Sequence, residues 1–171
     1  MRRCPQKASD IPQDGDANCT VTFGQFSEPS LLVPNLTSHD QESVLQELTQ
    51  RLVSAGRIKN STAFFEAALA REIQYPTVVG KEVVVPHVRS NDVLKLSVAV
   101  GMAADGVRWG SHGTARMVFL FAVPAAEAGK YLLLLSGLSR LISNKPIFAA
   151  LQEATESEEM LRLLNEAHLP G

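Results

Sequence analysis

The side chains best suited to chemistry in this chain are His87 and Arg89, which follow a run of three valines. Residues 83–85 are apolar and β-branched, which is typical of a buried strand. Pro86 lacks an N–H group, so we expect strand pairing to end there and His87 to lie at the strand exit. An imidazole can serve as base, ligand or nucleophile near neutral pH. Arg89 shares a face with His87 in an extended segment, and a guanidinium beside a histidine indicates chemistry on an anion such as phosphate.

The composition predicts one globular domain with a tail. The chain has 171 residues, of which 45% are hydrophobic and 20% charged, and this is enough apolar material for a core. The net charge of −2 gives no electrostatic reason to bind nucleic acid or an anionic membrane. Cys4 and Cys19 fit no zinc or redox spacing, and the absence of cysteine from the rest of the chain favours a cytoplasmic protein. No apolar run is long enough for membrane insertion.

The order of elements predicts an α/β sandwich, a mixed β-sheet flanked by helices. Residues 1–28 are polar and turn-rich and are predicted to be a flexible extension, which leaves 29–171 as the domain. The expected strands are 31–33, 83–85, 96–100 closed by Gly101, and an apolar central strand at 117–123. The expected helices are one opened by a capping box of Ser38 and Gln41, one over about 61–72, one over 127–142, one from Lys145, and one capped by Ser157.

The other histidines and the glycines give no competing site. His39, His112 and His168 lack metal-ligand spacing. We expect His39 to lie in the first turn of a helix, His112 in a loop between strands, and His168 among the solvated last residues. The chain has no Walker, GxGxxG or GxSxG pattern, which argues against nucleotide-dependent chemistry and serine hydrolysis. We therefore expect no metal and no cofactor.

The stretch from Ala68 to His87 resembles the enzyme IIA domains of the phosphotransferase system (PTS), of the fructose/mannitol/nitrogen-regulatory type. The matching features are Ala-Leu-Ala-Arg-Glu at 68–72, Thr77, Gly80 and Val-Val-Val-Pro-His at 83–87. The likeness continues through 98–101, 107–109, 118–124 and the Leu-rich helix at 135–141, and covers 31–164. It implies the sandwich fold of PTS IIA domains of the fructose/mannitol type.

The resemblance also implies roles for three side chains. His87 would be the phosphoryl acceptor, Arg71 would neutralise phosphate charge, and the Thr77 hydroxyl would hydrogen-bond a phosphate oxygen. Arg89 is added as possible support from its spacing alone. The implied partners are an HPr-like phosphocarrier as donor and an enzyme IIB, or a regulatory protein target, as recipient.

Three positions depart from the family pattern. Val78 and Glu82 stand where members usually carry glycine, and Glu82 is expected to bring a negative charge near the phosphate. Tyr131 stands where many members carry a second histidine near the acceptor; a tyrosine can donate a hydrogen bond but does not titrate near pH 7.

Three hypotheses follow for the function. The first is a phosphocarrier that takes a phosphoryl group on His87. The second is a nitrogen-type regulatory module whose phosphorylation selects its partners. The third is a domain that is never phosphorylated and acts by protein contact. Val78, Glu82 and Tyr131 favour it, and the retained His87, Arg71 and Thr77 oppose it.

Overall fold

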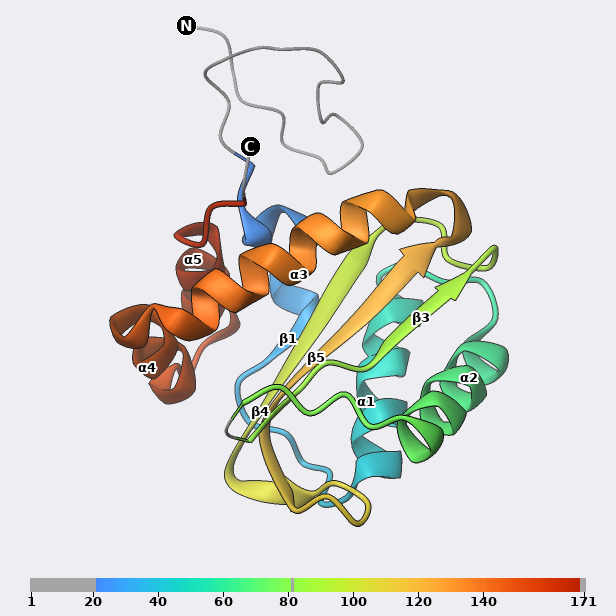
Figure 1. The fold of residues 1–171 in the computed structure, drawn as a ribbon, viewed down its shortest axis with the longest axis horizontal. Coiled ribbons are helices and arrows are strands. Elements are labelled where there is room, and N and C mark those ends of the chain that lie inside the picture. The colour runs from blue at the N-terminus through green and yellow to red at the C-terminus, as the bar shows by residue number, and fades with distance from the viewer. Residues whose placement is uncertain (1–20, 81, 170–171) are drawn as a thin grey trace, which may run out of the picture.

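The computed structural model, which describes residues 21–80 and 82–169, is built around a five-stranded mixed sheet (Figure 1). Its strands are β1 (Leu32–Val33), β2 (Val83–Val84), β3 (His87–Ser90), β4 (Ser97–Arg108) and β5 (Thr114–Pro124). β5 lies in the middle: it pairs antiparallel with β4 on one side and parallel with both β2 and β3 on the other. β1 pairs parallel with β4. The predicted mixed sheet with an apolar central strand is confirmed.

Helices cover both faces of this sheet. They are α1 (Gln41–Ser54), α2 (Ser61–Gln74), α3 (Ala128–Ser143), α4 (Lys145–Glu153) and α5 (Ser157–Asn165), with 3-10 turns η2 (Phe23–Phe26), η3 (Pro29–Leu31) and η4 (Ala125–Glu127). α1 and α2 share one core cluster with one sheet face, and α3, α4 and α5 share a second cluster with the other face. Figure 1 shows these two groups of helices on opposite sides of the strands. The α/β sandwich is confirmed.

The sequence of β5 reflects burial on both sides. Met117, Phe119 and Phe121 belong to the cluster under α3, whereas Val118 and Leu120 belong to the cluster under α1 and α2. Successive side chains of a strand point to opposite faces, so a strand covered on both faces is apolar throughout. This strand therefore forms a rigid base for the residues paired with it.

One predicted strand is longer than its sequence suggested. We expected Gly101 to close the strand at 96–100, but β4 continues to Arg108. A Cβ at Gly101 would lie 2.7 Å from Leu36 Cδ2, so the glycine is needed for close packing of the chain over the sheet rather than for a turn. The reversal comes later, through Gly110 and Gly113, both with positive φ.

Two predicted helix caps were wrong. Asp40, not Ser38, caps α1 and accepts a hydrogen bond from Ser43 N at 2.9 Å. The Ser38 hydroxyl instead donates to Glu47 at 2.6 Å. Ser157 is the first residue of α5 rather than its cap, and its hydroxyl donates to the Leu32 carbonyl at 2.8 Å. Ser38 thus bonds a side chain of the helix that it precedes, and Ser157 bonds a main-chain group far along the sequence, instead of capping.

The chain before residue 29 contributes to the core. Phe23 and Phe26 are 0% and 2% exposed and pack beneath α3 and α5. The expected flexible extension lies, for residues 1–20, outside the described residues, as do Cys4 and Cys19. Among the residues that are described, none of the helices combines the length and apolar character needed to cross a bilayer.

Candidate functional site

His87 is the first residue of β3 and not the residue after a strand. It pairs with Phe121 of β5, and the Pro86 carbonyl accepts a hydrogen bond from Phe121 N at 2.9 Å. The prediction of a strand exit was wrong because Pro86 only interrupts the pairing: it lacks a donor, yet its carbonyl still binds β5. The backbone at His87 is thus fixed against β5 by its own pairing with Phe121 and by the carbonyl of the preceding Pro86.

The His87 ring is half-buried and has two close neighbours. Its Nδ1 lies 3.4 Å from the Val85 carbonyl oxygen. Its ring centroid lies 5.1 Å from that of Tyr131, with the planes tilted by 32°. A carbonyl can only accept, so this contact favours the tautomer with the proton on Nδ1. The lone pair is then on Nε2.

Tyr131, in the first turn of α3, links His87 to the core. Its ring also meets Phe121 edge-on at 5.4 Å. Burial raises the pKa of Tyr131 to about 12, with Arg71 opposing the rise and Glu72 adding to it. The phenol is therefore neutral throughout the physiological range and remains a hydrogen-bond donor next to the imidazole.

Arg71 provides positive charge at the end of α2. Its side chain is exposed, and its guanidinium carbon lies 5.0 Å from the centre of the Tyr75 ring. Arg71 is close enough to Tyr131 for its charge to oppose the rise in the pKa of that tyrosine. An exposed guanidinium next to an aromatic ring retains its N–H groups for an incoming anion.

Thr77 is connected to the His87 segment through Val85, whose N–H donates to the Thr77 carbonyl at 3.0 Å. The hydroxyl donates to the Glu72 carboxylate and accepts from Val85 N at 3.2 Å. The expected hydrogen bond from Thr77 to a phosphate oxygen would require the hydroxyl proton, which is already donated to the Glu72 carboxylate. In the described geometry, Thr77 therefore acts as a brace for Val85.

Arg89 stands two residues beyond His87 on the same strand. Its Nε donates to the Ala125 carbonyl at 2.9 Å, which ties β3 to the turn that leads into α3. The side chain is exposed. Arg89 and Tyr131 thus fix the relative position of β3 and the start of α3.

Of the two departures at glycine positions, Glu82 lies away from His87. Glu82 pairs with Arg116 at 3.2 Å, and its neighbour Val83 is in register with Met117. His87 is in register with Phe121, four residues farther along β5, or about 13 Å at 3.3 Å per residue. The expectation that Glu82 brings negative charge to the phosphate site was wrong. Val78 bridges to Val84 and its side chain is 46% exposed.

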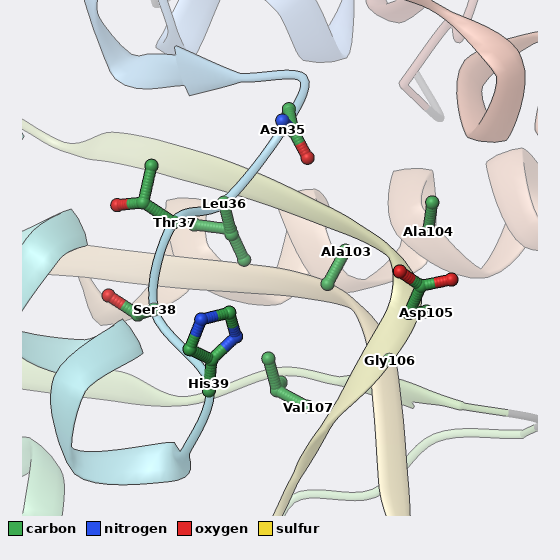
Figure 2. Close-up of a pocket in the computed structure, with 10 residues that line it drawn as sticks. All are labelled: Asn35, Leu36, Thr37, Ser38, His39, Ala103, Ala104, Asp105, Gly106 and Val107. Carbon is green, nitrogen blue, oxygen red and sulfur yellow. The ribbon is translucent and has the colours of Figure 1, made fainter.

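Other candidate positions do not converge on this site. A cavity of about 360 Å³ lies between the β1–α1 connection and the irregular part of β4, with His39 and Asp105 on its wall (Figure 2). His112 sits in the β4–β5 turn, and His168 is exposed near the end of the described chain. Within residues 21–80 and 82–169, no three His, Cys, Asp or Glu side chains are grouped to hold a metal ion.

The sequence did not identify Glu72 and Trp109 as residues that support the site. From the sequence, Glu72 had no role beyond its place in the Ala-Leu-Ala-Arg-Glu match at 68–72, but it is 1% exposed and accepts from Trp109 Nε1 at 3.0 Å. A signal was available: Glu72 continues the buried spacing of Phe64 and Ala68 on α2. A carboxylate on the apolar stripe of a helix requires buried donors. Nothing in the sequence identified Trp109 as their source.

The arrangement is suited to nucleophilic chemistry on a small anion. A half-buried imidazole whose Nδ1 faces a carbonyl keeps its lone pair on Nε2, a neutral phenol lies against the ring, and an exposed guanidinium supplies positive charge nearby. Hydrogen bonds to charged donors and positioned positive charge stabilise phosphoryl oxygens.

Sequence comparison identifies the relatives of this chain. Residues 25–167 match the family model described as the phosphoenolpyruvate-dependent sugar phosphotransferase system, EIIA 2. The chain is 31% identical over 134 residues to the PTS system fructose-specific EIIABC component of Bacillus subtilis; the match covers 77% of this chain and 21% of that protein. It is 30% identical to the PTS system fructose-specific EIIA component of Haloferax volcanii, covering 74% of this chain and 83% of the relative. The chain thus spans about a fifth of its larger relative.

Solved structures share the fold. The nitrogen regulatory protein IIA-Ntr of Neisseria meningitidis aligns with a TM-score of 0.74 at 24% identity, over 82% of this chain and 97% of its own. IIA mannitol of Escherichia coli aligns with a TM-score of 0.68 at 24% identity, over 80% and 97%. The resemblance drawn from residues 68–87 is confirmed: this chain belongs to the EIIA 2 family of the phosphoenolpyruvate-dependent sugar phosphotransferase system.

Proposed function

We propose that this protein is a phosphocarrier that accepts a phosphoryl group from an HPr-like donor on His87 and passes it to an enzyme IIB. The observation that carries this proposal is the His87 ring, half-buried, with Nδ1 facing the Val85 carbonyl. Its family membership supports a role in sugar phosphotransfer. A histidine placed in this way can receive and release a phosphoryl group without a nucleotide or a metal at this step.

The accepting atom in this proposal is Nε2. Because Nδ1 carries the proton that faces the Val85 carbonyl, Nε2 carries the lone pair. That lone pair attacks phosphorus in line while the bond from phosphorus to the donor's nitrogen breaks and its electron pair returns to the donor's ring. The Nδ1 proton stays on His87. The Val85 carbonyl stabilises the positive charge that the ring gains as the new N–P bond forms.

Arg71 and Tyr131 have separate tasks in this step. Arg71 offsets the negative charge of the transferred group, which is the largest electrostatic barrier to bringing two phosphoryl-carrying sites together. Tyr131 holds the plane of the His87 ring through their contact at 5.1 Å. Its raised pKa keeps the phenol neutral, so it adds no negative charge next to the phosphoryl group.

The surface around these residues is suited to transient protein contacts. Six exposed apolar side chains lie on α2, on the segment before β2 and on α3: Ile73, Tyr75, Val78, Val79, Leu132 and Leu133. Apolar side chains rimmed by arginine are typical of interfaces. One solved relative of the fold is a complex of enzyme IIA mannitol with phosphorylated enzyme IIB mannitol of Escherichia coli, and other relatives are multiphosphoryl transfer proteins. Both support a donor and an acceptor of the same class here.

The test is phosphorylation in vitro. The protein is incubated with phosphoenolpyruvate, enzyme I and HPr, and its mass is measured for the wild type, His87→Ala and His112→Ala. His112 is the matched control, an exposed histidine in the β4–β5 turn. We expect one acid-labile phosphoryl group on the wild type and the control, and none on His87→Ala.

The assay also separates the competing functions. No gain in mass, with a donor that phosphorylates another enzyme IIA in the same mixture, would overturn the proposal and leave a module that acts by protein contact. Phosphorylation without onward transfer to any enzyme IIB tested would limit the role to regulation. Transfer to an enzyme IIB, followed by loss of mass from this chain, is the result we expect.

A further inference from the structure

Glu72 is a buried carboxylate that the phosphoryl transfer step does not use. It is 1% exposed and lies in the last turn of α2. Three donors from two other segments converge on it: Thr77 N at 3.2 Å, the Thr77 hydroxyl and Trp109 Nε1 at 3.0 Å. A buried carboxylate is tolerated when it is bonded in this way, and each such charge-assisted bond is stronger than a neutral one. Its position therefore fixes Thr77 against α2.

Thr77 transmits this constraint to Val85. All three hydrogen-bonding groups of Thr77 are engaged: its N–H and hydroxyl proton go to Glu72, and its carbonyl accepts from Val85 N at 3.0 Å. The hydroxyl oxygen accepts from the same Val85 N at 3.2 Å. The segment 77–79 thus pairs antiparallel with 83–85, with Val79 N donating to the Val83 carbonyl at 2.8 Å.

Val85 in turn sets the orientation of His87. Its carbonyl is the group that faces His87 Nδ1 at 3.4 Å. Pro86 lies between them; its ring fixes φ and restricts the conformation of the residue before it. The segment 85–87 is therefore stiff, and among the hydrogen bonds described its side-chain anchor is Thr77.

We propose that Glu72 is the positioning residue of the phosphoryl acceptor: through Thr77 and Val85 it holds the carbonyl that keeps the proton on Nδ1 and leaves Nε2 free to react. Trp109, from the end of the β4–β5 pair, completes the Glu72 site and ties it to the sheet. This inference rests on the proposed function for its consequence, the transfer rate, but not for its structural content, the tautomer of His87.

The proposal requires a hydrogen-bonding side chain at position 72 and not a negative charge. A glutamine keeps one acceptor oxygen, which can serve Thr77 N and Trp109. Its NH₂ group would replace the carboxylate oxygen that now accepts from the Thr77 hydroxyl, and would donate to it instead. The Thr77 hydroxyl would then no longer donate to residue 72, but its oxygen would still accept from Val85 N. Glu72→Gln is therefore expected to preserve the tautomer, and Glu72→Leu, which has no acceptor, is expected to lose it.

The experiment measures tautomer and rate on the same full-length variants. They are Glu72→Gln, Glu72→Leu, Thr77→Val and Thr77→Ser. Thr49→Val is the control, because it makes the same substitution at a buried threonine whose hydroxyl has no partner among the described residues. The ¹⁵N shifts of the His87 ring are recorded at a pH where it is neutral and are assigned by their absence from His87→Ala. Initial phosphorylation rates are measured with HPr as the donor.

In the wild type, we expect Nδ1 to be the protonated nitrogen. Thr77→Val and Glu72→Leu should shift the ring towards a mixture of tautomers and slow phosphorylation by about tenfold or more. Thr77→Ser and Glu72→Gln should keep the wild-type tautomer, and Thr49→Val should leave both the tautomer and the rate unchanged. Thr77→Val carries the test alone if Glu72→Leu does not fold, since it removes only one hydroxyl.

Two results would overturn the inference. One is a wild-type ring protonated on Nε2. The other is a folded Thr77→Val with the wild-type tautomer and rate. If the wild type takes no phosphoryl group, the proposed function fails, while the ring shifts still decide whether Glu72 and Thr77 position His87.

Discussion

Tyr131 is the residue whose contribution to the site can be isolated most directly. The chain contains only two tyrosines and one tryptophan, so in Tyr75→Phe the phenolate absorbance reports Tyr131 alone. Tyr131 contacts both His87 and Phe121, and burial is the main cause of its raised pKa. Its ionisation therefore measures how well the ring is packed against His87.

We predict that Tyr131 in Tyr75→Phe ionises with a midpoint near 12, measured by absorbance at 295 nm during an alkaline titration. The pKa of the folded state is raised above the ordinary value of 10.0, so this group stabilises the fold fully below about pH 10 and loses that contribution as pH rises through about 12. Tyr131→Phe should remove this part of the alkaline loss of stability. A midpoint near 10 would contradict the packing described here.

At the scale of elements, the entry into β2 carries backbone strain. Glu82 has φ of 61°, in the left-handed region that disfavours a side chain. Its ion pair with Arg116 joins two exposed side chains, and such pairs contribute little. The family's usual glycine at this position would therefore fit the backbone better than the glutamate.

We predict that Glu82→Gly stabilises the protein by about 1 kcal/mol relative to Glu82→Ala, or a few degrees in Tm, measured by thermal denaturation. Both variants lack the ion pair, so their difference isolates the backbone effect. Phosphorylation of His87 should be unchanged in both variants, because Glu82 and His87 lie at separate positions along β5, next to Met117 and Phe121 respectively. Equal stability of the two variants would show that the turn carries no strain.

The sequence was most informative where burial alone decides the structure. The apolar run of 117–123 and the helical spacing of Val44, Leu45 and Leu48 predicted β5 and α1, because both patterns depend only on which side faces the core. The same holds for the Leu-rich helix α3.

Prediction failed where a polar side chain has a partner far along the chain. Ser157 donates to Leu32, 125 residues away, and Glu72 accepts from Trp109, 37 residues away. A local sequence pattern suggests only local roles for such side chains, such as a helix cap or a charge at a helix terminus. For the same reason, the sequence suggested a phosphate oxygen as partner of the Thr77 hydroxyl and gave no sign of its hydrogen bond to Glu72.

At the scale of the whole molecule, a line of aromatic rings joins the segment that precedes η3 to His87. Phe23 meets Phe119 and Phe121 edge-on at 6.0 and 6.1 Å, Phe121 meets Tyr131, and Tyr131 meets His87. Edge-on ring pairs stabilise packing beyond the area that they bury. The segment before residue 29 therefore supports the site from beneath.

We predict that Phe23→Ala lowers the free energy of unfolding by about 3–5 kcal/mol, measured by urea denaturation, because it leaves a cavity between α3 and β5. Leu132→Ala is the control: this side chain is 65% exposed, and its loss should change stability by less than about 0.5 kcal/mol. Similar stabilities of the two variants would mean that Phe23 is not part of the folded core.

The interrupted edge formed by β2 and β3 determines how another protein can approach His87. The outer side of β2 is occupied by residues 77–79, Pro86 offers no N–H, and the four residues of β3 include the charged Arg89. Short, broken and charged edges resist the addition of a further strand. A visiting protein therefore meets side chains rather than free main-chain groups, so it can dock and leave without the sheet being extended, as repeated brief encounters require.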